Sequence, residues 1–368
     1  MKKLWTVAVA LLVLVGLAVI VPCLRAGETK AGSRYQVLAP IRNGNLSIFP
    51  VVSESSHDTA QFLTLDEGLR SGEVVVTEAG SVGPLVRPRP GHPVWDEHPR
   101  TGGAQVSQLV LINNSKRPLL LLAGEIVTGG KQDRIIGKDR LVPAESDPVD
   151  LSVFCVEPGR WVGTSGKFGA PMAMVQPSVR AKAMADKDQH QVWDQVAKAR
   201  MSMAETVTVE AGAVAAAPIQ ESSSYAGAVE NRAVRKQIDS VAAPMEQQYQ
   251  SVIRQLRDRH AVGVVVAVNG QVIWADVFAS SSLLEKYWPK LVRSYAAETF
   301  SQQGKSAAVD VRAAQEFLDR LDGRRQIVES EPGLYRHSET TGDGYKVFAL
   351  TSLLPSTGFD LHLAKMEE

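Results

Sequence analysis

The stretch Val262-Gly-Val-Val-Val-Ala-Val-Asn-Gly-Gln-Val-Ile-Trp-Ala-Asp-Val-Phe278 carries the clearest fold signal in the chain. Two runs rich in β-branched and aromatic residues, 262–268 and 271–278, flank Asn269-Gly270, the dipeptide preferred in two-residue hairpin turns. The stretch therefore predicts a β-hairpin. It opens a C-terminal α/β unit that we place at residues 261–368.

Downstream of the hairpin, apolar residues recur at helical spacing. Residues 281–300 carry a broad apolar face, and Pro289 is expected to kink this helix or to begin a new one. A second helix, with Val311 and Leu321 in its apolar stripe, is expected to end at Gly323. Three strands should complete the unit, at 326–328, 345–350 and 360–363.

Upstream, residues 34–180 are mostly short apolar or alternating runs bounded by Asn, Gly, Pro and Ser, a pattern typical of sandwich-like sheets. Thr64 and Glu67 have the spacing of a capping box and predict a short helix at 64–70. The sequence therefore predicts a β-rich domain here. Its expected strands are 45–52, 73–77, 108–112, 119–123 and 149–156.

Between these regions, residues 181–260 change to the helical period. Two apolar stripes predict two helices, with a kink or break at Pro244, and the small residues of 207–224 predict a mobile linker or loop between them. The fold class is therefore α+β, with a β-rich sandwich-like N-terminal region, a helical middle segment and a smaller C-terminal α/β unit. The sequence leaves open whether the first and last regions share one continuous core.

The N-terminus has the pattern of an export signal. Met1-Lys2-Lys3 precedes an uncharged apolar run, 4–21, and we expect a signal peptide over 1–26 with cleavage after Ala26. The run is also long enough to stay as an uncleaved anchor. We therefore expect an extracytoplasmic protein, periplasmic or secreted, or one tethered to the membrane by this segment alone.

Composition narrows the classes of partner. Lys+Arg and Asp+Glu are balanced at 40 each, so no overall field recruits nucleic acid or anionic lipid. Only Cys155 follows residue 26, which excludes an internal disulfide framework in a cleaved chain. Phosphate-loop, dinucleotide and nucleophile-elbow motifs are missing from the sequence. His92 and His98 in a Pro-rich stretch do not make a convincing metal site, and the sequence indicates no metal and no identifiable cofactor.

The densest group of polar residues follows two apolar runs. It lies in Ala123-Gly-Glu-Ile-Val-Thr-Gly-Gly-Lys-Gln-Asp-Arg134 and in Phe154-Cys-Val-Glu-Pro-Gly-Arg-Trp161. Turns at strand ends are where a rigid sheet presents functional side chains. Glu125 and Glu157 are the candidate acid and base, if there is catalysis. The candidate ligand-binding residues are Gln132, Asp133, Arg134, Arg160 and Trp161, because arginine pairs can hold an anion and an amide can recognise a hydroxyl. The same residues could instead lock the fold through ion pairs.

Cys155 alternates in phase with Val149, Leu151 and Val153, which predicts that its thiol faces the apolar side of a strand. A buried thiol is normally inert, and a reactive one would need a nearby cation such as Arg160.

These segments also carry a family resemblance. Together with Val262-Gly-Val-Val-Val-Ala-Val-Asn-Gly and Trp288-Pro-Lys-Leu-Val-Arg-Ser-Tyr-Ala296, the two polar runs resemble the ARG and rhodanese-phosphatase-superfamily-associated protein domain, over about Tyr35 to Ala297. The resemblance implies association with ADP-ribosylglycohydrolases and rhodanese-like phosphatases, and hence a ligand with ribose and phosphate. It carries over no catalytic residue.

We therefore expect an exported protein that binds a small molecule or a protein partner through the turns at 125–134 and 157–161. The alternative is a hydrolase or transferase with Glu125 or Glu157 as general base, acting on an ADP-ribose-like substrate. A third reading gives these residues a structural role only. Convergence of these residues on an open pocket would favour binding or catalysis, and a carboxylate left unpaired in that pocket would favour catalysis over binding. Mutual pairing without a cavity would favour a structural role.

Overall fold

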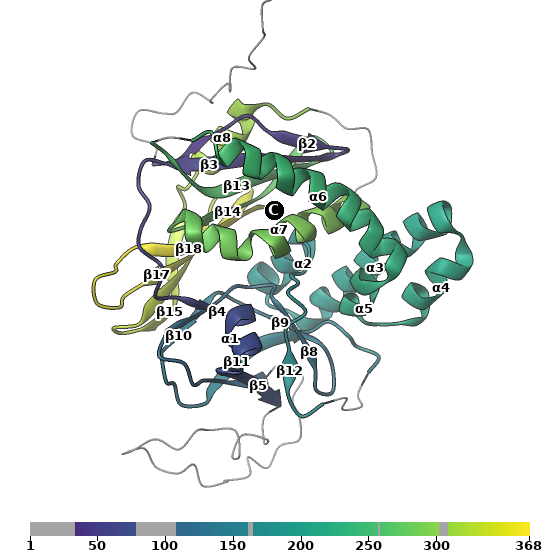
Figure 1. The fold of residues 1–368 in the computed structure, drawn as a ribbon, viewed down its shortest axis with the longest axis horizontal. Helices are drawn as coiled ribbons and strands as arrows, with labels where there is room; N and C mark the ends of the chain where they lie inside the picture. The colour runs from purple at the N-terminus through teal and green to yellow at the C-terminus, as the bar shows by residue number, and fades with distance from the viewer. Residues whose placement is uncertain (1–33, 79–107, 161–164, 257, 302–307) are drawn as a thin grey trace, which may run out of the picture.

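The computed structural model describes residues 34–78, 108–160, 165–256, 258–301 and 308–368 (Figure 1). The predicted signal or anchor, His92, His98 and Trp161 all lie outside these ranges. Within the described ranges, none of the helices combines the length and the apolar character needed to cross a membrane.

A nine-stranded antiparallel sheet joins the two ends of the chain. The predicted hairpin is confirmed, with Asn269 and Gly270 at φ 51° and 82°, as a turn with positive φ at both central residues requires. The strand order is β1-β3-β13-β14-β18-β17-β16-β15, with β2 also paired to β3. The strands are β1 (Gln36–Val37), β2 (Ile41–Asn43), β3 (Leu46–Ser53), β13 (His260–Val268), β14 (Gln271–Phe278), β15 (Arg324–Glu331), β16 (Tyr335–Thr341), β17 (Tyr345–Ser352) and β18 (Asp360–Glu367).

Two smaller sheets hold the remaining described strands, β4 to β12, in the lower part of Figure 1. One has the order β10-β7-β4 and the other β12-β8-β9-β11-β6-β5. Thr64 caps α1 (Leu65–Ser71) and the predicted capping box with Glu67 is confirmed. The strands are β4 (Leu63–Thr64), β5 (Val74–Glu78), β6 (Gln108–Asn113), β7 (Leu119–Leu121), β8 (Ile126–Gly129), β9 (Arg134–Ile136), β10 (Arg140–Val142), β11 (Val149–Cys155) and β12 (Phe168–Gly169).

The predicted linker at 207–224 is wrong, because that stretch is largely helical. Its alanines have the highest helix propensity of any residue, and Gly212 at φ 87° separates two helices. Pro244 and Pro289 lie inside helices that continue past them, so neither divides its helix. The helical elements are α2 (Pro177–Ala181), the π-helical turn η2 (Lys182–Asp186), α3 (Gln189–Ala211), α4 (Ala213–Glu221), α5 (Tyr225–Glu230), α6 (Arg232–Ile253), α7 (Ser281–Ser301) and α8 (Val311–Asp319).

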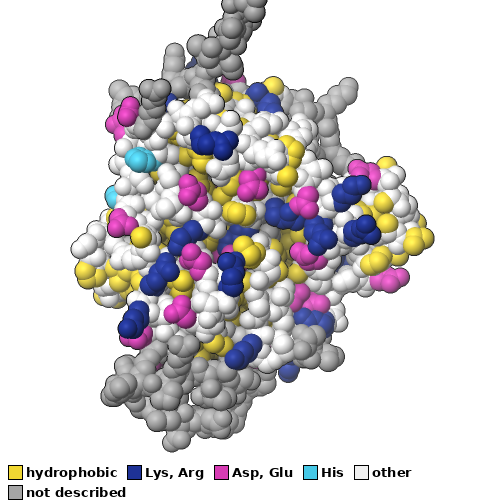
Figure 2. All heavy atoms as spheres, in the orientation of Figure 1, with side chains coloured by type: hydrophobic (Ala, Val, Ile, Leu, Met, Phe, Trp, Pro, Cys, Tyr) yellow, Lys and Arg dark blue, Asp and Glu magenta, His cyan; other side chains and the backbone are white. Residues whose placement is uncertain are grey.

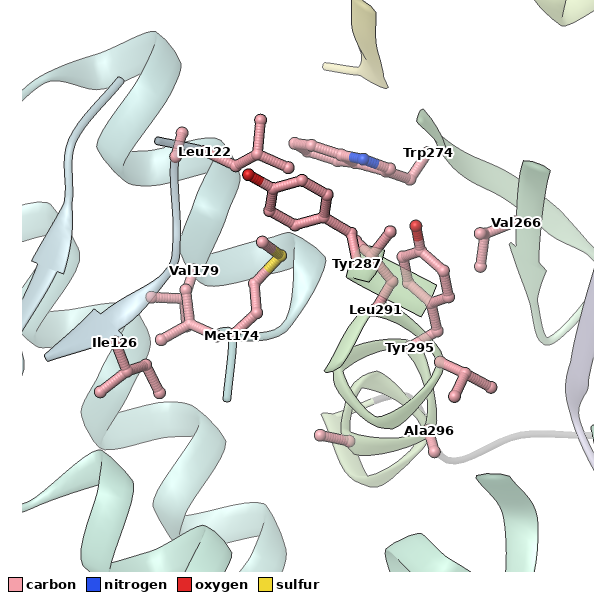
Figure 3. Packing of buried hydrophobic residues seen from close by; sticks show 14 of the residues in the cluster. Leu122, Ile126, Met174, Val179, Val266, Trp274, Tyr287, Leu291, Tyr295 and Ala296 are labelled. Carbon is pink, nitrogen blue, oxygen red and sulfur yellow. The ribbon is translucent and has the colours of Figure 1, made fainter. Parts of the chain in front are cut away.

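The large sheet is covered on both faces. Val264 and Val266 of β13 pack in the same core cluster as α6 and α7, whereas Val265 and Ala267 pack in the cluster that contains α8. Figure 3 shows the ring of Tyr287, from α7, lying beside Trp274. The α7 cluster runs from Ile41 to Met366 in the sequence, so the first and last regions share a core. The α+β class is confirmed, but the boundary placed at residue 180 does not separate the sheets.

The surface agrees with the balanced composition. On the face shown in Figure 2, basic and acidic side chains are interspersed rather than gathered by sign.

Candidate functional site

The two predicted polar turns lie side by side. Strand β9 pairs with both β8 and β11, and Arg134 lies opposite Cys155 in the register. The amide of Val156 donates to the carbonyl of Asp133 at 3.1 Å, which joins the chain before β9 to the chain after β11. The structure thus brings Gln132, Asp133, Arg134, Glu157 and Arg160 together.

Arg160 is the centre of an ion-pair group that we call the Arg160 cluster: Asp133, Glu157, Arg160 and Ser224. Its Nη2 lies 2.6 Å from Glu157 Oε2 and 3.2 Å from Asp133 Oδ1. Ser224 Oγ donates to Asp133 Oδ2 at 3.1 Å, and the amide of Asp133 donates to Glu157 Oε2 at 3.0 Å. The bond to Glu157 raises the pKa of Arg160, and burial, then the charge of Glu157, raises the pKa of Asp133. The carboxylates of Asp133 and Glu157 thus already accept hydrogen bonds from Arg160, Ser224 and a backbone amide.

Arg134 differs from its neighbours, because it is a buried cation with unused donors. Its side chain is 0% exposed, and Nη1 makes only a long contact of 3.5 Å to the carbonyl of Asp133. Nε and Nη2 are buried and have no hydrogen-bond partner in the part of the chain that the structure describes. Burial, the main cause, lowers the pKa of Arg134, although a guanidinium stays charged in proteins.

Two acceptors near this arginine are also unused as far as the described residues go. Gln132 donates through Nε2 to the carbonyl of Glu157 at 3.1 Å, but its Oε1 is buried without a partner. Glu78 accepts from the amide of Lys131 at 3.0 Å through Oε1, and its Oε2 is buried without a partner. The charge of Glu78 acts on Arg134. The region around Arg134 thus contains both donors and acceptors whose hydrogen bonds are not made.

Glu125 belongs to another cluster. Its Oε1 pairs with Lys290 of α7, which also pairs with Asp66 Oδ2 at 2.5 Å, and its Oε2 accepts from the amide of Leu122 at 2.6 Å. Glu125 is 1% exposed, and burial raises its pKa against the pull of Lys290. The structure therefore separates Glu125 from Glu157 and gives each one a different cationic partner.

Sequence reasoning missed a second buried network, centred on Asp276 of β14. Arg180 donates to both oxygens of Asp276, at 2.9 and 3.0 Å, and Tyr295 donates to Oδ2. His362 bridges Asp276 at 3.0 Å and Asp139 at 2.6 Å. The only signal in the sequence was a charged residue inside the apolar run 271–278 and a histidine inside the run 360–363. This network contains the fully buried Arg180, Asp276 and His362, so it supports the fold.

Cys155 is 0% exposed, which confirms the predicted apolar face of β11. Burial raises the pKa of its thiol, although the charge of Arg134 acts in the opposite direction. The thiol is therefore held in its less reactive, protonated form.

The model of one family, the ARG and Rhodanese-Phosphatase-superfamily-associated Protein domain, matches residues 34–364. This match covers nearly all of the chain after the predicted signal, and the chain belongs to that family. Neither a curated protein nor a solved structure matches the chain.

Proposed function

We propose that this chain is a binding protein whose ligand presents a carboxylate or phosphate group to Arg134. The observation that carries the proposal is the unpaired Nε and Nη2 of a side chain that is 0% exposed. Buried polar groups in native proteins are nearly always hydrogen-bonded, and a buried donor left unpaired costs about 1–3 kcal/mol, or more when it is charged. An acceptor at this edge would remove that cost.

The geometry of the guanidinium selects the class of ligand. Nε and Nη2 lie on one edge of the group, and two parallel donors on one edge match the two oxygens of a carboxylate or phosphate. The unused acceptors of Gln132 and Glu78 call for donors, which hydroxyl or amide groups next to the anion would supply. Arg160, with 22% of its side chain exposed, is the part of the cluster that faces solvent. A phosphorylated sugar such as ADP-ribose has this combination of groups, which agrees with the family's association.

Binding is better supported than hydrolysis or transfer. A general base must be free to take a proton, but Glu157 pairs with Arg160 and Glu125 pairs with Lys290. These pairs favour a structural role for both carboxylates. The unpaired edge of Arg134 is what distinguishes a binding site here from a fold lock.

A thermal-shift panel on the full chain tests the proposal, using ADP-ribose, ribose 5-phosphate, inorganic phosphate and citrate. A ligand at about a hundred times its dissociation constant adds about 2.7 kcal/mol, which is about 3 °C in a chain of 368 residues. The shift should vanish in Arg134→Met and persist in the matched surface variant Arg235→Gln, whose arginine is 51% exposed.

The melting temperature of Arg134→Met without ligand distinguishes a binding role of Arg134 from a structural one. Because Arg134 makes no ion pair among the described residues, its removal should leave the melting temperature of Arg134→Met unchanged or higher than that of the parent. A shift that survives in Arg134→Met would contradict the proposal. So would a ligand-free Arg134→Met that melts several degrees lower while no compound in the panel binds.

We also propose that the protein acts outside the cytoplasm. This proposal is supported only by the charged start and the apolar run at 4–21. N-terminal sequencing of the protein recovered from the periplasm or medium should begin at Gly27. An intact N-terminus in the membrane fraction would support the anchor instead, and recovery from the cytosol would refute export.

A further inference from the structure

A pocket lies away from the Arg160 cluster, where three elements meet. Its volume is about 320 Å³, within the range of small-molecule sites. The end of α6, the start of β13 and the first turn of α7 form its walls. The apolar part of the lining comes from Ile253, Leu256, Ala261 and Leu284.

Two residues that line this pocket carry hydroxyl groups that have no hydrogen-bond partner within the described ranges. Tyr249 is only 2% exposed, and its Oη makes no hydrogen bond. Ser281 Oγ is likewise buried and unpartnered. The Tyr249 ring stacks on Trp288, with the ring centroids 4.2 Å apart. A buried tyrosine hydroxyl usually has a partner, and the Tyr249 hydroxyl has none among the described residues.

The charges around the pocket favour an anion. Arg254, Arg259 and His260 line it, against a single carboxylate from Glu285. Arg259 also donates to Gln36, whereas Arg254 makes no ion pair among the described residues.

The pocket also meets the N-terminal end of α7. Ser280 caps this helix by accepting from the amide of Leu283 at 3.0 Å. The positive end of the helix dipole therefore lies beside Ser281, where it favours a negative group. Burial, and after it the charge of Glu285, raises the pKa of Tyr249. Its hydroxyl thus stays protonated at neutral pH and can donate a hydrogen bond.

We propose that this pocket binds a small organic anion, whose carboxylate or phosphate accepts hydrogen bonds from Tyr249 and Ser281 and whose apolar body packs on Ile253 and Leu284. A neighbouring hollow of about 570 Å³ shares Leu256 and Arg259 with the pocket, but it also contains Glu54 and Asp258. A ligand that extends into this hollow carries its anionic group at the Tyr249 end. The site is independent of the one proposed at Arg134.

Calorimetric titration of the full chain with benzoate and phenyl phosphate tests the site, and benzamide serves as the uncharged probe of the same shape. Tyr249→Phe keeps the ring and removes only the hydroxyl, so it should weaken binding of either anion about tenfold or more. Arg254→Gln should weaken binding and reduce its salt dependence. Arg134→Met and Arg235→Gln should bind as the parent does, which separates this site from the first.

Stability measurements distinguish binding from a structural role for the hydroxyl. Because Tyr249 Oη has no partner, Tyr249→Phe should melt no lower than the parent. Three outcomes would overturn the proposal: equal affinity in Tyr249→Phe and the parent, benzamide binding as tightly as benzoate, or no binding of either anion tighter than about 1 mM. Preference for one anionic probe over the other would identify the ligand group as a carboxylate or a phosphate.

Discussion

Replacing Asp276 by Asn should destabilise the protein more than any surface change, because Asp276 is the acceptor for three buried side chains. Arg180 donates to both of its oxygens at 2.9 and 3.0 Å, Tyr295 donates to one, and His362 approaches the other at 3.0 Å. Asparagine keeps the shape but removes the charge and replaces one acceptor with a donor. Arg180, which is 0% exposed, then loses its counter-charge.

Breaking a buried ion pair by removing one partner costs about 3–5 kcal/mol. The entropy of unfolding is about 2.1 cal/mol/K per residue, which gives about 0.8 kcal/mol/K for 368 residues. The melting temperature of Asp276→Asn should therefore fall by about 4–6 °C. Urea unfolding, followed by tryptophan fluorescence, should show the same loss as a lower midpoint with an unchanged slope.

The double variant Arg180→Met/Asp276→Asn is the decisive control. It removes the uncompensated cation, so it should be more stable than Asp276→Asn alone, and its loss should be smaller than the sum of the two single losses. Additive losses would refute the reasoning, since they would mean that the two side chains do not depend on each other. A loss below about 1 kcal/mol in Asp276→Asn would refute it as well.

Three further changes have expected results. The pKa of His362 is raised to about 9 by its two carboxylate partners despite its burial, so its stabilisation of about 3 kcal/mol is complete below pH 6.5 and is lost as the pH rises through 9. Burial lowers the pKa of Lys365 to about 7, so Lys365 makes the free energy of unfolding rise with pH between 7 and 10.5, opposite to the effect of His362. The quantity to measure is therefore the difference in unfolding free energy between the parent and His362→Gln, which should shrink with rising pH. Cys155 should resist thiol reagents until the protein is unfolded in urea, and labelling at the rate of a free thiol in the native state would contradict its burial. Gly263→Ala should cost about 1–3 kcal/mol in urea unfolding, because a Cβ there would lie 2.4 Å from the carbonyl oxygen of Asp276, and a neutral result would contradict that contact.

Local patterns in the sequence predicted local structure well. The Asn269-Gly270 turn, the Thr64 capping box and the alternation that buries Cys155 each depend on residues a few positions apart. The pairing of β3 with β13 joins segments about two hundred residues apart, and nothing in either strand specifies the other. The helix in place of the expected linker shows a different error, in which alanine was grouped with loop-forming small residues despite its helix propensity.

The candidate site was predictable only in part. Gln132, Arg134 and Arg160 converge because the start of β9 and the end of β11 lie at the same end of one sheet. The position of the end of β11 could be predicted from the sequence. The assignment of Glu125 to Lys290 depends on α7, which lies 165 positions away. The unpaired edge of Arg134 is a property of packing, and no sequence pattern distinguishes it from a paired arginine.

The buried polar groups of α7 explain why the two halves of the chain form one structure. Tyr287 donates to the carbonyl of Leu120 at 3.0 Å, and Lys290 pairs with Asp66 and Glu125. One helix of the C-terminal half therefore satisfies backbone and charged groups of the N-terminal half. Because leaving such groups unpaired in the interior is costly, separation of the halves would expose or orphan them. Both proposed sites consequently belong to a single folded unit, and their occupancy can be compared in one protein by the variants at Arg134 and Tyr249.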